Sequence, residues 1–259
     1  MQALRIASTG MHAQQTNVDV LSNNVANLST TAFKQHNAAF NDLVYLNKIG
    51  VGSTTSSVGT IAPTGAQIGL GVNVGSIYRI MSQGPINNTD NTFDIAIQGR
   101  GFFKITTPDG STKYTRDGSF QLDNAGQLVT KEGYPLDPGI TISEDAVDVT
   151  ISADGVVTGK VNETLTNFGT ITLSMFTNEA GLESQGDNLY AETEASGTAT
   201  DVTAGESGSG TMLQGSLEAS NVDPIESITR LITAQRAYEL NSRIISTADE
   251  MLSALNQIS

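Results

Sequence analysis

Histidine and carboxylate side chains are the residues of this 259-residue chain that could carry out chemistry. The two histidines, His12 and His36, have a single acidic residue, Asp19, between them, and the sequence has no cysteine. Metal sites and histidine-based triads need closely grouped ligands or partners. We therefore expect no metal-binding residue and no histidine-based or cysteine-based catalytic residue, and a chain without cysteine is indifferent to the redox compartment.

The 27 acidic residues could still supply a pair of carboxylates for acid/base chemistry, as in a wall-active glycosidase. Most of them occur at turn positions such as Asp117-Gly118 and Asp154-Gly155, where a solvated role is expected. The glycines of residues 69–75 resemble a dinucleotide-binding loop, but they precede a strand and do not join a strand to a helix. The sequence predicts a protein that is not an enzyme and has no cofactor, with the glycosidase as a remote alternative.

The net charge of −14 argues against nucleic-acid or membrane-surface binding, because a polyanion repels both phosphate backbones and anionic lipid. The apolar runs are only a few residues long, so no membrane-inserted helix is expected. The N-terminus lacks the basic and apolar regions of a cleavable signal peptide. If the protein leaves the cytoplasm, we expect a route that does not read such a signal.

Glycine and charge divide the chain into regions. Gly10 is the only glycine in the first 49 residues, and the last 44 residues have none. Residues 76–205 carry seven basic and eighteen acidic residues, a net charge of −11. Glycine-poor ends and a turn-rich middle predict long terminal helices and a central antiparallel β domain, hence an α+β fold.

The N-terminal segment has a heptad pattern typical of a coiled-coil-like helix layer. Gln14 occupies one of its positions, where a buried polar side chain could fix the register, as Asn241 could in the C-terminal segment. The remaining seven positions are apolar, and we predict that they form a subunit interface: Leu4, Ala7, Met11, Val18, Leu21, Val25 and Leu28.

The C-terminal segment has a wider apolar face, with a helix start at Asn221 or Asp223 before Pro224. A third apolar row beside the heptad positions exceeds what one partner helix could cover. We predict a second subunit interface here: Leu231, Ala234, Gln235, Arg236, Tyr238, Asn241, Ile244, Ile245, Met251, Leu252 and Leu255.

The middle of the chain predicts an extended arm followed by strands. Residues 46–75 are rich in Gly, Ser and Thr, which favours an arm or connector. From Val72 onward, apolar residues alternate and turn signals recur about every ten residues. The predicted organisation is an N-terminal helix and signature over residues 1–45, the arm over 46–75, an acidic antiparallel β domain over 76–205, and a return linker with the C-terminal helix over 206–259.

Several motifs in order resemble those of bacterial flagellar rod and hook proteins. The N-terminal signature of that family matches Asn23, Asn24, Ala26, Asn27, Thr30, Phe33 and Lys34, with Ala32 where the family usually has glycine. Residues 94–103, 114–120, 126–130 and 133–136 resemble its β-domain blocks, and residues 214–222 and 234–242 resemble its C-terminal signature.

The resemblance implies a structural subunit of the flagellar rod, most similar to those of the distal rod. Such subunits form a helical tube that transmits torque from motor to hook across the periplasm and encloses the export channel. The implied partners are further copies of the chain, proximal rod and hook-side proteins, the outer-membrane and peptidoglycan rings, and the type III export apparatus. A proximal rod or hook subunit is the alternative within the family.

Terminal helices that lack partners within one chain would order at a net entropic cost. We therefore expect residues 1–45 and 216–259 to fold on assembly.

Overall fold

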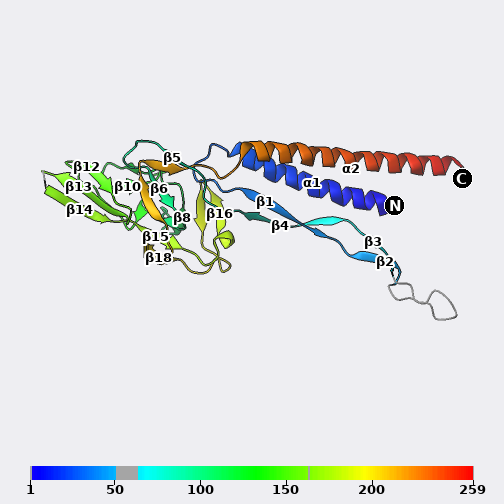
Figure 1. Ribbon diagram of the computed structural model, residues 1–259, viewed down its shortest axis with the longest axis horizontal. Coiled ribbons are helices and arrows are strands. Elements are labelled where there is room, and N and C mark those ends of the chain that lie inside the picture. Colours follow the sequence, from blue (N-terminus) through cyan, green and yellow to red (C-terminus); the bar gives the residue numbers. More distant parts are fainter. Residues whose placement is uncertain (1, 51–63, 163, 259) are drawn as a thin grey trace. The chain divides into compact units, whose positions relative to one another are not determined.

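The computed structural model describes residues 2–50, 64–162 and 164–258, and the chain divides into two compact units (Figure 1). The first comprises Met1–Ala26, His36–Arg79 and Asp223–Ser259, and we call it the helical unit. The second comprises Asn27–Gln35 and Ile80–Val222, and we call it the β unit. None of the described helices is both long and apolar enough to cross a membrane.

Two long helices, α1 (Gln2–Ala26) and α2 (Pro224–Ile258), form the main part of the helical unit. They pack against each other along their length and run antiparallel, so that N- and C-terminus lie at the same end of the pair (Figure 1). Both the predicted N-terminal helix and the predicted C-terminal helix are therefore present. Absence of glycine after Gly215 and a single glycine in α1 favour such long helices.

The start of α2 is fixed by Asp223 and not by Asn221. The Asp223 carboxylate accepts hydrogen bonds from the backbone N–H groups of Ile225 (2.8 Å) and Glu226 (3.0 Å), and Pro224 occupies the first helical position. The Asn221 side chain instead accepts from Gln35 N and donates to the carbonyl of Ile80 within the β unit.

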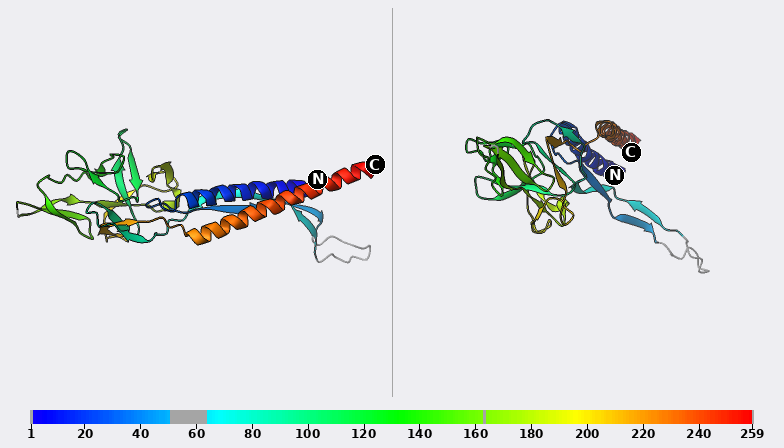
Figure 2. Two further views of the ribbon diagram at one scale, coloured as in Figure 1. Left: turned by 90° about the horizontal axis from the view of Figure 1, so that it is seen from above. Right: turned by 60° about the vertical axis from the view of Figure 1, so that its left-hand side comes forward.

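A long β hairpin completes the helical unit (Figure 2). Strand β1 (His36–Asp42) pairs with β4 (Val72–Arg79), and β2 (Tyr45–Ile49) pairs with β3 (Ala66–Gly69). The predicted arm over residues 46–75 thus begins earlier, ends later and is a paired hairpin in its described part. Its Gly/Ser/Thr-rich centre, residues 51–63, lies outside the described residues.

The β unit consists of antiparallel strands and one short 3₁₀ helix, η1 (Glu179–Gly181). Its largest sheet has the order β16-β17-β8-β7-β15-β18, with β11 paired to β7. Strands β12, β13 and β14 form a three-stranded sheet, and β9–β10, β6–β19 and β5–β20 form pairs. The strand bounds are β5 Ile86–Asn88, β6 Ile95–Gln98, β7 Phe102–Thr106, β8 Thr112–Thr115, β9 Gln121–Leu122, β10 Leu128–Val129, β11 Leu136–Asp137, β12 Val147–Ile151, β13 Val156–Val161, β14 Thr164–Thr170, β15 Thr172–Met175, β16 Glu183–Gly186, β17 Leu189–Ala191, β18 Thr200–Thr203, β19 Thr211–Gln214 and β20 Ser216–Glu218.

Two hydrophobic clusters form the core of the β unit. The larger one includes Ile95, Phe103 and Leu173. The smaller one is mainly aromatic, and its Phe102 and Tyr114 rings both stack edge-on against Phe176. These residues come from several strands that are distant in sequence, so the core forms only when the strands pair.

The β unit is larger than the predicted β domain over residues 76–205. The expected return linker contains β19 and β20, which pair with β6 and β5. Residues 27–35, expected to belong with the N-terminal helix, also lie in the β unit. Both ends of the β unit therefore carry parts of the family signatures.

Ala32 adopts a left-handed backbone conformation, with φ of 56°, and is 1% exposed. Its N–H donates to the backbone carbonyl of Glu218 (2.8 Å), so this conformation ties residues 30–34 to β20. A left-handed conformation costs alanine about 1–2 kcal/mol that glycine avoids. This explains why glycine is usual at this position.

We predict that Ala32→Gly stabilises the protein by about 0.5–1 kcal/mol, since relief of backbone strain outweighs the greater freedom of glycine in the unfolded chain. Urea-induced unfolding of the two proteins measures the difference. As a matched control, Ala96→Gly in β6, which is equally buried but not at a positive φ, should lower stability. Equal stability losses for both variants would contradict the strain at Ala32.

Candidate functional site

Helix α1 is covered on two sides by its own chain. On one side it packs against α2, where Gly10 adjoins Asn241. On another side, the Thr9 hydroxyl accepts a hydrogen bond from Val72 N (3.4 Å), where the hairpin lies against the helix. This packing differs from the expectation that neither terminal helix has enough partners within one chain.

The predicted N-terminal interface residues lie mostly at this intrachain packing. Ala7 and Leu21 are buried, and the other members on α1 are half-buried: Leu4, Met11, Val18 and Val25. Leu28 lies beyond the end of α1, in the β unit, and is half-buried.

The predicted C-terminal interface residues divide into two sets. Ala234 is buried, and Leu231, Asn241, Ile245 and Leu252 are half-buried. Gln235, Arg236, Tyr238, Ile244 and Met251 are exposed, while the side chain of Leu255 lies outside the described residues. The described heptad positions of α2 are therefore buried or half-buried within the chain, apart from the exposed Tyr238, whereas Ile244 and Met251 of the third row are exposed.

An apolar surface of α2 remains open to solvent, and we call it the exposed apolar face of α2. Its exposed fractions are Ile225 79%, Ile228 48%, Ile232 45%, Leu240 59%, Ile244 48% and Met251 57%. The sequence reasoning missed Ile225, Ile228, Ile232 and Leu240. Spacings of three and four residues among the isoleucines were a usable signal, but they were obscured by the stronger heptad pattern beside them. Several exposed large apolar side chains on one helix are typical of a protein–protein interaction site.

Gly10 and Asn241 meet where the two helices approach closely. A Cβ atom added at Gly10 would lie 3.0 Å from the Asn241 side-chain nitrogen, which explains the single glycine of α1. The other predicted polar heptad position, Gln14, accepts a hydrogen bond from Asn17 (3.4 Å). The side chains of Gln14 and Asn241 are both half-buried, so a role of these residues in fixing register stays a prediction.

The asparagines of the N-terminal signature shape the turn after α1. The buried Asn24 side chain donates to the carbonyl of His36 (2.8 Å) and accepts from its N–H (2.9 Å), so it satisfies both backbone groups of the first residue of β1. Asn27 accepts from the Thr30 hydroxyl (3.0 Å). Asn23 and Ala26 are exposed, and Phe33 is half-buried.

Lys34, the last signature residue, belongs to a buried ionic cluster in the β unit. Its ammonium lies 2.6 Å from Glu218 Oε1, and both side chains are 1% exposed. Arg116 Nε lies 2.9 Å from Glu218 Oε2. One carboxylate therefore neutralises two buried cations from distant parts of the sequence, and we call these three residues the Glu218 cluster.

Backbone groups complete the Glu218 cluster. The Lys34 ammonium donates to the carbonyl of Ser82 (2.9 Å), and Gly84 N–H donates to Glu218 Oε1 (2.9 Å). Arg116 donates to the carbonyls of Gly99 (2.7 Å) and Gly101 (3.2 Å). Buried charges are tolerable only when they are paired and hydrogen-bonded in this way.

The pKa of Lys34 lies below its usual 10.5, because burial lowers it and the neighbouring Arg116 guanidinium lowers it further, while Glu218 partly opposes the shift. The unfolded chain therefore binds more protons than the folded protein as the pH approaches 10.5 from below. The contribution of Lys34 to stability consequently rises with pH across that window.

The residues considered for chemistry do not assemble into a site. His12 and His36 line separate grooves, and within the described ranges no three His, Cys, Asp or Glu side chains are placed to hold a metal ion. Asp19 lines the same groove as His36, at the side of α1. The glycine-containing residues 69–75 lie at the end of β3 and in β4, not before a helix.

Three family models match consecutive parts of the chain. Residues 4–34 match a model of flagella basal body rod proteins, residues 96–159 match the D1 domain of the flagellar hook protein FlgE/F/G, and residues 213–258 match the C-terminal region of flagellar basal body rod FlgEFG proteins. The chain is 53% identical to the flagellar basal-body rod protein FlgG of Caulobacter vibrioides over 100% of this chain and 99% of the relative. The chain belongs to the flagellar basal-body rod protein family.

More distant relatives agree with this membership. The FlgG protein of Bacillus subtilis is 40% identical over 98% of both chains. The flagellar hook-basal body complex protein FlhP of the same organism is 33% identical over 100% of this chain and 99% of the relative. As a member of the rod family, the chain is a structural subunit and not an enzyme, and neither the family models nor the relatives support a glycosidase.

The Glu218 cluster takes one residue from each region that matches a rod-family model. Lys34 closes the N-terminal match, Arg116 lies in the D1 match, and Glu218 lies in the C-terminal match. Arg116 and Glu218 lie within the family-like segments 114–120 and 214–222. Nothing local in the sequence indicates that these two residues and Lys34 meet.

We predict that Glu218→Gln destabilises the protein by about 3–5 kcal/mol, because it leaves two buried cations without a counter-charge. Lys34→Met should cost only about 1–2 kcal/mol, since a neutral Arg116–Glu218 pair remains and mainly hydrogen bonds are lost. Lys34→Met should also remove the gain in stability with rising pH below 10.5. Denaturant unfolding measured at several pH values gives both quantities, and similar losses for the two variants would contradict the central role of Glu218.

Proposed function

We propose that the chain is a subunit of the distal rod that assembles through its terminal helices into a helical tube. In this proposal the tube transmits torque from the motor to the hook across the periplasm and encloses the export channel. The exposed apolar face of α2 is the observation that carries the proposal. Similarity to FlgG over the whole chain favours this subunit over a proximal rod or hook subunit.

Burial of the exposed apolar face supplies the energy for assembly. Covering a large apolar side chain contributes about 1.5–3 kcal/mol. With Ile225, Ile228, Ile232 and Ile244 among the exposed side chains, several such contributions remain unrealised in the single chain. In the tube, α1 and α2 of neighbouring copies form a coiled-coil-like layer that covers these side chains.

The other parts of the proposal concern partners and location. Proximal rod proteins and hook or hook-side proteins adjoin the rod along its axis, and the outer-membrane and peptidoglycan rings surround it. The subunit reaches this place through the flagellar type III export apparatus without cleavage of a signal peptide. The described part of the hairpin, with the pairs β1–β4 and β2–β3, acts as an extended arm in the assembly.

In this proposal, assembly covers more apolar surface on α2 than on α1. Helix α1 has α2 and the hairpin as partners within the chain, whereas α2 has α1 on one side and solvent on the opposite side. We therefore assign folding on assembly chiefly to α2.

We predict that Ile232→Asp abolishes polymerisation while the monomer keeps its helix content, because a charge replaces an apolar side chain outside the α1–α2 contact. Sedimentation and electron microscopy measure polymer, and circular dichroism measures helix. Leu231→Asp should also abolish polymerisation and leave the β unit folded, because Leu231 lies on the half-buried side of α2 that must pack when the helix folds on assembly. Ser242→Asp, an exposed polar position of the same helix, is the control and should polymerise normally. Wild-type polymers from Ile232→Asp would argue against the proposed interface.

We further predict that amide hydrogen exchange in residues 224–258 is fast in dilute monomer and slows on polymerisation. Exchange in the β unit should be slow in both states, because its core is complete within one chain. Mass spectrometry of peptides from both states makes the comparison. Uniformly slow exchange in the monomer would show that α2 is already stable and would contradict folding on assembly.

A further inference from the structure

Residues 211–222 link several distant segments of the β unit, and we call them the closing segment. Strand β19 in this segment pairs with β6, and strand β20 pairs with β5. The Met212 N–H donates to the carbonyl of Ala153 (3.0 Å), and the Ala219 N–H donates to the carbonyl of Pro85 (2.8 Å). The closing segment thus binds parts of the chain that precede it by very different distances in sequence.

Strand β6 depends on the closing segment for its ladder of hydrogen bonds. Its residues Ile95, Ala96 and Ile97 are at most 1% exposed, and β19 is the only one of the described strands that pairs with β6. Without β19, backbone N–H and C=O groups of this buried apolar strand would lose their partners, which is strongly unfavourable. The larger hydrophobic cluster, to which Ile95 and Ile97 belong, is therefore incomplete until the closing segment docks.

The Gln214 side chain is a second link between the closing segment and earlier strands. It accepts a hydrogen bond from the Ile151 N–H (3.0 Å) and donates to the carbonyls of Thr92 and Val149 (3.0 Å each). Thr92 precedes Gln214 by 122 residues and Ile151 precedes it by 63 residues. One side chain of the closing segment thereby joins β12 to the residues before β6.

The Glu218 cluster makes the same dependence electrostatic. Glu218 follows Lys34 by 184 residues and Arg116 by 102 residues. At a synthesis rate of about 5–20 residues per second, Arg116 exists for roughly 5–20 s before its counter-charge is made. Burial of Arg116 and Lys34 during that time would leave two cations unpaired. A core that buries both side chains therefore cannot form early.

Residues 27–35 also dock on the closing segment. The Asn221 N–H donates to the carbonyl of Phe33 (3.3 Å), and the Gln35 N–H donates to Asn221 Oδ1 (2.7 Å). Together with the Lys34 ion pair, these bonds join the first and last residues of the β unit in sequence. The N-terminal signature thus has its main binding partner in a segment that is made much later.

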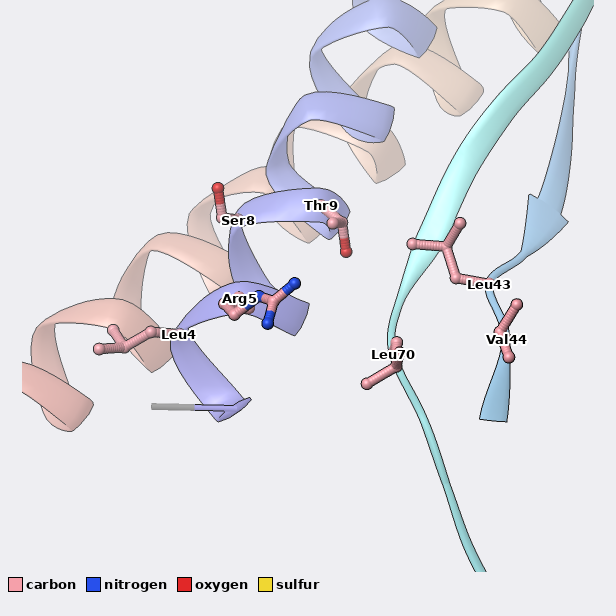
Figure 3. A pocket seen from close by; sticks show the side chains of 7 residues that line it. All are labelled: Leu4, Arg5, Ser8, Thr9, Leu43, Val44 and Leu70. Carbon is pink, nitrogen blue, oxygen red and sulfur yellow. The ribbon is translucent and has the colours of Figure 1, made fainter. Parts of the chain in front are cut away.

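The segments that are synthesised first offer little alternative packing. Helix α1 packs more extensively on α2, which follows the closing segment, than on the hairpin. Figure 3 shows a groove of about 510 Å³ between the first turns of α1 and the hairpin, with Leu4 opposite Leu43, Val44 and Leu70. Val44 is 78% exposed in this groove. We therefore expect no stable intermediate of α1 and the hairpin before α2 is made.

We propose that the closing segment delays folding, so that the β unit stays unfolded until residues 211–222 have been synthesised. The inference rests on the proposed rod function, since a narrow export channel admits an extended chain far more readily than a folded unit. The order of the residues along the chain enforces the delay, because the partners of β6, Lys34 and Arg116 all lie in the closing segment.

Synchronised cell-free translation of the full-length wild-type chain, sampled with brief pulses of protease, tests the delay directly. We expect a protease-resistant β unit only on chains longer than 222 residues. Protease-resistant fragments of the β unit on shorter nascent chains would overturn the proposal.

Removal of the buried charges should shorten the delay. A buried ionic triad can often be replaced by apolar side chains without loss of stability. We expect the triple variant Lys34→Met/Arg116→Met/Glu218→Met to refold from urea about tenfold faster than wild type, because its core can form before distant charges have paired. Stopped-flow fluorescence of the tyrosines measures the rate.

The control for the triple variant is Lys104→Met. This substitution removes ion pairs with Asp137 and Asp201, which form without any residue of the closing segment. Its refolding rate should stay within about twofold of wild type. A triple variant that refolds no faster than this control would contradict the role of the Glu218 cluster in the delay. The translation experiment uses the wild-type chain, so it decides the proposal even if the triple variant does not fold.

The delay and the rod function can fail separately. Early folding during translation would overturn the delay and leave the rod function standing, because polymerisation of the purified chain does not depend on when it folded. Failure of the wild-type chain to polymerise under any condition would overturn the proposed function, and with it the purpose assigned to the delay.

Discussion

The β unit depends on one carboxylate that neutralises two buried cations. Glu218 in β20 binds Lys34 and Arg116 through its two oxygens, and its own backbone carbonyl accepts the Ala32 N–H. Unpaired buried charges are strongly unfavourable. The three segments that supply these residues must therefore pack together cooperatively. The residues that adjoin α1 and α2 in sequence, 27–35 and 216–222, are thus fixed parts of the β unit and not flexible linkers.

The helical unit is organised differently, because its two helices are unequally covered. Helix α1 lies between α2 and the hairpin, and close approach at Gly10 and at Gly71 gives this packing a defined register. Helix α2 buries one side and leaves isoleucines and Met251 on the other side in solvent. In the monomer, the exposed apolar side chains that lack packing partners therefore lie mainly on α2.

Membership of the rod family explains why the chain combines a β unit with a buried ionic cluster and a helical unit with exposed apolar side chains. A torque-transmitting subunit needs a unit that keeps its fold under load and a surface that binds other copies. The Glu218 cluster suits the first requirement, because separating its paired charges within the low-polarity interior is strongly unfavourable. The exposed apolar side chains of α2 suit the second, because they lack packing partners within one chain.

The sequence by itself determined the local features: helices at both ends, strands in the middle, Asp223-Pro224 as a helix start, and the family signatures. Those features depend on periodicity and turn chemistry, which act over a few residues. Tertiary structure decided which residues meet. Lys34, Arg116 and Glu218 are separated by more than 80 residues at each step, and no local pattern marks one partner for another. The same reason applies to the heptad residues of α2, which the sequence analysis took as contacts between subunits. Periodicity indicates an apolar face, but only the fold determines which neighbour covers it, as Asn241 shows where it adjoins Gly10 of α1.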